Sequence, residues 1–345
     1  MKRGNHLIVT AFLKAGNNIL WGENSNCNLL FRLRVAVLQY QFMIINNLNT
    51  FIGDELKQVF GQKVYKLSLD TGFTCPTRDG TKGSAGCFYC GSTGSHFAGL
   101  GSHMEEPING VKSITDQIKN GKQFLKTRYN VSKFIAYFQA FTSTYGPLET
   151  LEAMLQTAVQ DPEIVGINLA TRPDCLGDEV FSVLSDYLLP SYHWLEIGLE
   201  SSHDATLKLC GRGHNYADFL SGYKRAKQAG FRICVHVILG LPGETEAMIT
   251  ETIDRLIELN IDGIKFHNLH ILKNSVFEKE YLKGNITIYT LNEYSELLAK
   301  LVKKLPKSIV IHRLMGDAPK SFLIAPDWVL DKQTALALIN KKIYA

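Results

Sequence analysis

The stretch WLEIGLES, residues 194–201, decides the fold because its two faces differ in polarity. Side chains along a strand alternate between faces, so Glu196 and Glu200 share one face, while the aliphatic Leu195, Ile197 and Leu199 share the other. The stretch RICVHVIL, residues 232–239, divides in the same way and places His236 opposite a row of aliphatic side chains. Both stretches therefore predict strands with one apolar face and one partly polar face.

Short β-rich runs alternate with helical patterns on both sides of these two stretches. The predicted strands cover residues 64–69, 134–141, 165–170, 194–199, 232–239 and 263–269. The predicted helices cover residues 113–128, 148–160, 178–188, 216–229, 246–259 and 291–305. Such alternation is typical of a parallel sheet.

The polar strand faces distinguish between two kinds of parallel sheet. An open sheet covered by apolar helices on both faces would leave Glu196 and His236 without polar partners. The inner face of a barrel can instead line a cavity. The sequence therefore predicts an α/β fold, a partial (β/α)6 TIM-like barrel with parallel strands and short N- and C-terminal extensions. Functional groups are expected at the carboxyl ends of the strands.

The domain organisation is predicted from where this pattern begins and ends. We expect residues 43–315 to form the barrel domain and residues 316–345 to form a C-terminal segment that packs on it. Residues 1–42 do not share the strand–helix alternation of the barrel domain, so we expect an N-terminal extension that carries none of the chemistry. Whether translation of the native protein starts at Met1 or downstream of it is left open. No apolar run reaches 18 residues, which argues against a membrane span.

Composition narrows the class of protein. The 345 residues carry a net charge of only +4, which excludes a strongly basic nucleic-acid module but leaves room for local basic patches. The chain has seven cysteines, an odd number, and no evident secretory signal. A framework of disulfides is therefore not favoured, and we expect a cytoplasmic protein.

Three of the cysteines lie in one glycine-rich loop, CPTRDGTKGSAGCFYC, residues 75–90. The loop directly follows the first predicted strand, where a barrel places its active site. Three interpretations are open. The cysteines are small core residues, or a structural zinc site is completed by His96, or three thiolates hold an iron–sulfur cluster and leave one iron open.

A set of motifs adds a family resemblance. With YFQAFTSTY (137–145), ATRPDCL (170–176), EIGLES (196–201), GRGHNY (211–216) and ILGLPGET (238–245), the loop resembles the cluster loop of radical SAM (S-adenosylmethionine) enzymes. The set is similar to the YhcC/YtqA-type subgroup, which is related to the radical SAM domain of the Elongator catalytic subunit. The C-x11-C-x2-C spacing matches the longer first gap of this subgroup.

The resemblance implies two cofactors, a [4Fe-4S] cluster and SAM. Cys75, Cys87 and Cys90 would each ligate one iron, and the amino and carboxylate groups of SAM would chelate the fourth. The resemblance also implies SAM contacts, with Tyr89 beside the adenine, Gln139 and Thr142 near the amino group, Glu200 at the ribose hydroxyls, Arg212 at the carboxylate, and the backbone of Ile238, Leu239 and Gly240 along the adenine.

Substrate-side residues are expected at the mouth of the same cavity. Asp174 and Cys175 follow the third predicted strand, and Lys265, His267 and His270 lie along or just after the sixth. Cys175 is a candidate catalytic residue, because a thiol can give a hydrogen atom to a substrate radical. The closing segment HRLMGDAPKSFLIAPDW, residues 312–328, resembles that of the family without suggesting a role.

The implied function is an oxidoreductase- or transferase-type radical SAM enzyme that cleaves SAM to a 5′-deoxyadenosyl radical. The relation to the Elongator branch suggests a tRNA substrate, a wobble uridine or its side chain. A reductant protein such as flavodoxin or ferredoxin would be a partner. The alternatives are a radical SAM enzyme for a small molecule and a zinc-stabilised binding protein without redox chemistry.

Overall fold

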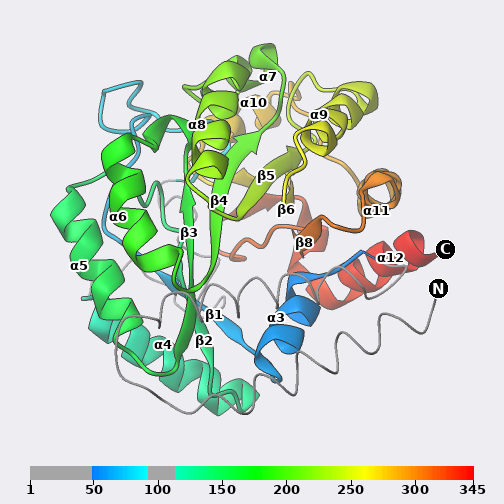
Figure 1. Ribbon diagram of the computed structural model, residues 1–345. Coiled ribbons are helices and arrows are strands. Elements are labelled where there is room, and N and C mark those ends of the chain that lie inside the picture. Colours follow the sequence, from blue (N-terminus) through cyan, green and yellow to red (C-terminus); the bar gives the residue numbers. More distant parts are fainter. Residues whose placement is uncertain (1–48, 92–112) are drawn as a thin grey trace, which may run out of the picture. The chain divides into compact units, whose positions relative to one another are not determined.

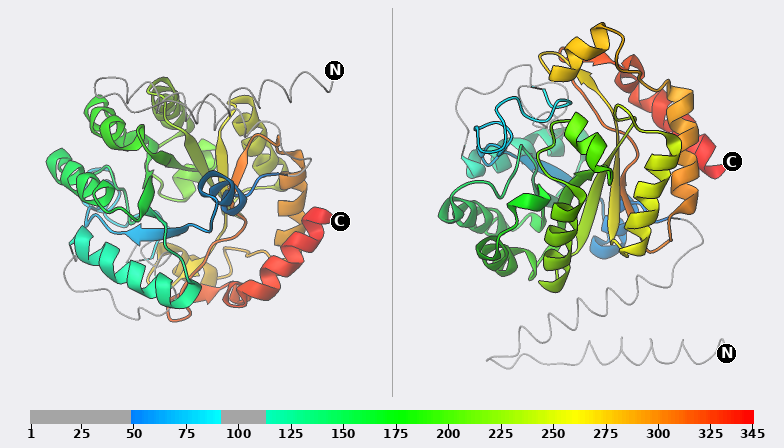
Figure 2. Two further views of the ribbon diagram at one scale, coloured as in Figure 1. Left: turned by 60° about the horizontal axis from the view of Figure 1, so that its bottom comes forward. Right: turned by 90° about the horizontal axis from the view of Figure 1, so that it is seen from above.

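Parallel strands form the centre of the computed structural model, which describes residues 49–91 and 113–345. One sheet has the order β1-β2-β3-β4-β5-β6-β8, and Figure 2 shows it curled, with helices on its outer side. The strands are β1 (Tyr65–Leu69), β2 (Phe134–Phe138), β3 (Ile164–Thr171), β4 (Tyr192–Glu200), β5 (Ile233–Leu239), β6 (Gly263–Asn268) and β8 (Val310–Arg313). The predicted α/β partial TIM-like barrel is confirmed.

Helices follow most of the strands along the chain, and several of them cover the outer face of the sheet (Figure 1). They are α3 (Ile52–Phe60), α4 (Ile114–Tyr129), α5 (Leu148–Val159), α6 (Asp178–Leu188), α7 (Asp204–Leu209), α8 (Tyr216–Gln228), α9 (Glu246–Glu258), α10 (Val276–Leu282), α11 (Leu291–Lys304) and α12 (Lys332–Tyr344). Short 3-10 turns lie at Pro173–Cys175 and Asp327–Leu330, and β7 (Ile271–Leu272) pairs antiparallel with β9 (Leu323–Ala325).

The two faces of β4 behave as the alternation predicts. Leu195, Ile197 and Leu199 are fully buried in the main hydrophobic core. The apolar side chains of α9 pack into the same core. This helix is capped at its N-terminus by Thr245, whose side chain accepts a hydrogen bond from the Met248 backbone N–H. The apolar strand faces therefore pack on the helices, which leaves the polar faces for the inside of the barrel.

The carboxylate of Glu196 is the centre of a polar network inside the barrel. Its side chain, on β4, is completely buried, and its carboxylate meets one side chain from each of the other strands in the sheet. The partners are Lys66 on β1 (2.8 Å), Tyr137 on β2 (2.6 Å), Asn168 on β3 (3.3 Å), His236 on β5 (2.8 Å), Lys265 on β6 (2.9 Å) and His312 on β8 (3.6 Å). Neighbouring Lys265 and Lys66 hold the pKa of Glu196 well below its usual value despite burial.

The structure corrects the number of strands. The sequence predicts six, whereas β8 (Val310–Arg313) adds a seventh beside β6. This strand is short and ends in His312 and Arg313, so it gives no clear β-rich run. The predicted C-terminal segment 316–345 contains β9 and α12, whose Ala335, Ile339 and Ile343 are buried.

Two other expectations concern the remainder of the chain. The predicted extension 1–42 lies outside the described residues, and the predicted domain boundaries stay predictions. Across residues 49–91 and 113–345, no helix combines the length and the apolar composition that crossing a bilayer would need.

Candidate active site

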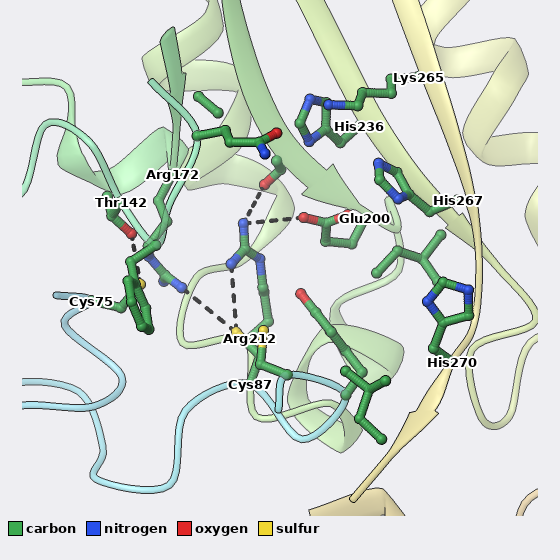
Figure 3. A pocket seen from close by; sticks show the side chains of 18 of the residues that line it. Cys75, Cys87, Thr142, Arg172, Glu200, Arg212, His236, Lys265, His267 and His270 are labelled. Atoms are coloured by element: carbon green, nitrogen blue, oxygen red, sulfur yellow. Dashed lines mark hydrogen bonds and ion pairs between the residues drawn. The ribbon is translucent and has the colours of Figure 1, made fainter. Parts of the chain in front are cut away.

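The three loop cysteines line one cavity at the carboxyl ends of the strands (Figure 3). Cys75 Sγ lies 2.9 Å from the hydroxyl of Thr142, which follows β2. The cavity measures about 220 Å³, whereas a single buried water needs roughly 10–15 Å³. It therefore has room for a ligand of many atoms beside the cysteines.

Glycine lets the loop bring the cysteines together. Gly86, directly before Cys87, has a φ of +73°, a left-handed conformation that strains other residues. A Cβ at this position would also lie 3.0 Å from the guanidinium carbon of Arg78. The sequence places glycine where the loop turns back toward the sheet.

Two guanidinium groups surround the central cysteine. Arg212 Nη1 lies 3.5 Å from Cys87 Sγ, and Arg172 Nη1 lies 4.0 Å from it. A hydrogen bond with Cys90, supported by these two arginines, holds the pKa of Cys87 well below its usual value. Positive charge next to a thiolate suits a cluster of sulfides and thiolates.

The cavity carries polar atoms that lack partners. Among the described residues, no hydrogen-bond partner is found for the buried atoms Tyr89 Oη, Arg212 Nε, His267 Nε2 and His270 Nε2. All four residues line the cavity. Buried polar groups are nearly always satisfied in native proteins, so these atoms indicate a polar ligand.

The donor set fits a cluster better than a single ion. Within residues 49–91 and 113–345, no three His, Cys, Asp or Glu side chains are grouped tightly enough to hold one metal ion. Three cysteines around one end of a cavity can each bind a different iron of a larger group. His96, the fourth ligand of the zinc alternative, lies outside the described residues. No fourth cysteine lines the described cavity.

Arg212 and Glu200 lie side by side next to the cysteines. Arg212 Nη2 donates to the backbone oxygen of Gly198 at 2.8 Å and lies 3.4 Å from a Glu200 oxygen. Glu200 has a φ of +72° at a register shift between β4 and β5, the kind of bulge that aims a side chain at a site. Burial raises the pKa of Glu200 to about 7.

Gly198 leaves the space that this pair occupies. A Cβ on Gly198 would lie 2.6 Å from Arg212 Nη2 and 2.6 Å from Glu200 Oε1. Gly198→Ala is therefore expected to displace both side chains and to weaken SAM binding at least about tenfold, the effect of losing one charged hydrogen bond. Equilibrium dialysis with labelled SAM measures it. Gly53→Ala, where a Cβ meets nothing within 4 Å, is the control, and equal binding by both variants would refute the assignment.

Only some of the other residues assigned to SAM line the cavity. Tyr89, Gln139, Thr142 and Ile238 line it. Leu239 is buried in the main core and Gly240 lies against the ring of Tyr289, so neither is among the lining residues. Their backbone contacts stay predictions.

The residues assigned to the substrate separate into two groups. Lys265, His267 and His270 line the cavity, whereas Asp174 and Cys175 are not among its lining residues. Asp174 is held by Arg172 at 2.9 Å and by Lys82 at 2.6 Å. Burial and the nearby Asp174 raise the pKa of Cys175 to about 12. The raised pKa keeps Cys175 as the thiol, the form that can give a hydrogen atom. The roles of Asp174 and Cys175 stay predictions.

Several cavity residues were not assigned from the sequence, and the charged residues Arg172, Arg313 and Asp317 are among them. Arg172 belongs to the quoted motif ATRPDCL, and its position directly after a strand was the available signal. Arg313 and Asp317 come from the closing segment, to which the sequence alone assigns no role. Both are brought to the cavity by β8, the strand that was not predicted.

Comparisons with known proteins concern the family of the chain. The family model "Radical SAM superfamily" matches residues 80–256, and "Radical_SAM C-terminal domain" matches residues 261–345. The chain is 36% identical to the protein YtqA of Bacillus subtilis over 289 residues. The aligned region covers 84% of this chain and 87% of YtqA.

Two further proteins are more distant. A tRNA uridine(34) acetyltransferase of Dehalococcoides mccartyi is 25% identical over 183 residues, 52% of this chain and 39% of that protein. The structure of archaeal Elp3 from Methanocaldococcus infernus superposes with a TM-score of 0.57 at 15% identity, over 80% of this chain and 63% of that one. This last likeness concerns the fold. The chain belongs to the radical SAM superfamily, whose members are enzymes that use a [4Fe-4S] cluster and SAM.

Proposed function

We propose that the protein cleaves SAM reductively. The observation that carries the proposal is the position of Cys75, Cys87 and Cys90 at one end of a cavity that continues past Arg212 and Glu200. A bound cluster would supply one electron to the sulfonium of SAM, breaking a carbon–sulfur bond to give methionine and a 5′-deoxyadenosyl radical.

The side chains of this protein would hold and shield the reactants. The guanidinium of Arg212 can donate two hydrogen bonds to one carboxylate, and the carboxylate of Glu200 can accept from two ribose hydroxyls. Tyr89 is partly buried beside the cysteines, and its hydroxyl oxygen is buried without a hydrogen-bond partner among the described residues. Burial of Arg212 and Glu200 helps to keep bulk water away from a reactive radical.

We further propose that the substrate is a uridine at the wobble position of tRNA, or its side chain. Two observations support this choice, the motifs shared with the Elongator branch and the similarity to a tRNA uridine(34) acetyltransferase. The chain matches 39% of that relative, so its whole activity is not carried over. The enzyme would work in the cytoplasm with a reductant such as flavodoxin or ferredoxin.

The tRNA proposal predicts a changed nucleoside. Mass spectrometry of tRNA nucleosides from cells with and without the gene is expected to show one modified uridine gained or lost. Complementation with the native gene should restore the profile, whereas a Cys90→Ala gene should not. An unchanged profile would contradict the tRNA substrate and favour a small molecule.

A further inference from the structure

The cavity extends away from the cysteines to a second group of side chains, which we call the far end. It consists of His236, Lys265, His267, His270, Arg313 and Asp317. These residues come from β5, from β6 and β8 at the opposite edge of the sheet from β1, and from the segments that follow β6 and β8. Figure 3 shows Cys75 and Cys87 on one side of Glu200 and His267 and His270 on the other.

Positive charge exceeds negative charge around the far end. Glu196 is shared by two lysines, Lys66 at 2.8 Å and Lys265 at 2.9 Å. Asp317 is likewise shared by Arg313 at 3.4 Å and Lys332 at 2.9 Å. The side chain of Lys265 is only 6% exposed. The side chains of Lys66, Arg313 and Lys332 are 23%, 21% and 55% exposed, so Lys265 is the buried cation of the group. A buried cation is unfavourable without an anion, and Lys265 has only a share of the Glu196 carboxylate.

The histidines do not add to this charge. Burial, with Arg313 next, lowers the pKa of His267 well below its usual value, and burial lowers those of His236 and His270 to about 4. Burial lowers the pKa of Lys265 only to about 8. At neutral pH the far end therefore presents the cations Lys265 and Arg313 and the carboxylate Asp317, which is paired with Arg313 and Lys332, beside neutral imidazoles.

Donors are available for a ligand at this place. The ammonium of Lys265 donates to Tyr137 at 2.6 Å and to Glu196 at 2.9 Å, which leaves one of its three hydrogens. The contact of Arg313 with Asp317, at 3.4 Å, is longer than a charge-assisted hydrogen bond. His267 Nε2 and His270 Nε2 are buried without partners among the described residues.

The closing segment completes the far end. Gly316 donates its backbone N–H to the Asn268 side chain at 3.0 Å. A Cβ on Gly316 would lie 2.7 Å from Cε1 of His270, so the backbone packs directly on this ring. Asp317, Ala318 and Pro319 then line the cavity. This contact gives a role to a motif for which the sequence alone suggests none.

We propose that the far end binds an oxyanion of the substrate, a carboxylate or a phosphate, through Lys265 and Arg313, with His267 and His270 as additional donors. The inference rests on the proposed function, in which the substrate meets SAM in this cavity. It adds a chemical requirement, namely that the group that anchors the substrate carries negative charge.

The test is a calorimetric titration of anaerobically reconstituted, SAM-saturated protein, in which SAM already occupies Arg212. The probes are malonate, inorganic phosphate and neutral malonamide. Malonate or phosphate is expected to bind at a single site. The anion that binds more tightly shows whether the substrate group is a carboxylate or a phosphate. Lys265→Met and Arg313→Gln should each weaken it at least about tenfold, as expected for one charged hydrogen bond. Malonamide should not bind.

Matched variants separate this site from general charge effects and from misfolding. Lys300→Met and Arg225→Gln remove surface cations that are paired with Glu246 and Asp178, and they should bind the anion as the wild type does. If Lys265→Met fails to fold, Lys265→Arg is measured in its place. It keeps the charge and should retain anion binding.

Two results would overturn the inference. One is no binding of malonate or phosphate to the wild type, and the other is equal affinity in the wild type and Arg313→Gln. Neither result would contradict the proposed tRNA substrate, because that proposal is tested separately by the nucleoside profile. An unchanged profile with clear anion binding would instead point to a small anionic substrate.

Discussion

Glu196→Gln is expected to lower the free energy of unfolding by about 3–5 kcal/mol, the range for breaking a buried ion pair. The amide keeps the shape of the side chain but leaves Lys66 and Lys265 without their shared counter-charge. Because the pKa of Glu196 is depressed in the folded protein, its contribution is present at neutral pH and is lost as pH falls through that depressed pKa. Denaturant unfolding at neutral pH measures the effect.

Two further variants show whether charge is the cause. Glu246→Gln breaks an exposed pair with Lys300 and should leave stability nearly unchanged, because water screens surface ion pairs. Glu196→Gln combined with Lys265→Met should lose less than the sum of the single variants, because the two groups interact directly. If Glu196→Gln is no more harmful than Glu246→Gln, the buried network does not stabilise the barrel.

The strand alternation predicted the inside of the barrel but not its contacts. The polar face of WLEIGLES identifies Glu196 as an inward residue, since alternate side chains must point to opposite faces. Its partner Lys66 lies 130 residues earlier in the chain. Which residues meet across a parallel sheet depends on register, which is set by packing along every strand between them.

The candidate site was predictable at several of the strand ends. The cysteine loop after β1 and Glu200 at the end of β4 lie as the motifs indicate. Asp174 also follows a strand, but the 3-10 turn at Pro173–Cys175 and two bonds from Arg172 hold its carboxylate in place. Sequence position alone does not reveal such an ion pair, and it did not reveal Arg313 on the short strand β8.

The second large effect concerns the cysteines. Cys87→Ala and Cys90→Ala are each expected to reduce the iron of anaerobically reconstituted protein from about four atoms per chain to below about one, because each thiolate would hold one iron of the cluster. Cys210→Ala is the matched control, since Cys210 is buried in a separate apolar group and is not among the residues lining the cavity. It should keep its iron.

The formation of 5′-deoxyadenosine from SAM under dithionite provides the final test of these proteins. Reconstituted wild type and Cys210→Ala should both produce it, and Cys90→Ala should produce none. Undiminished production by Cys90→Ala would contradict the assignment of the cluster ligands. No production by a wild-type protein that holds about four irons per chain would contradict reductive cleavage of SAM itself.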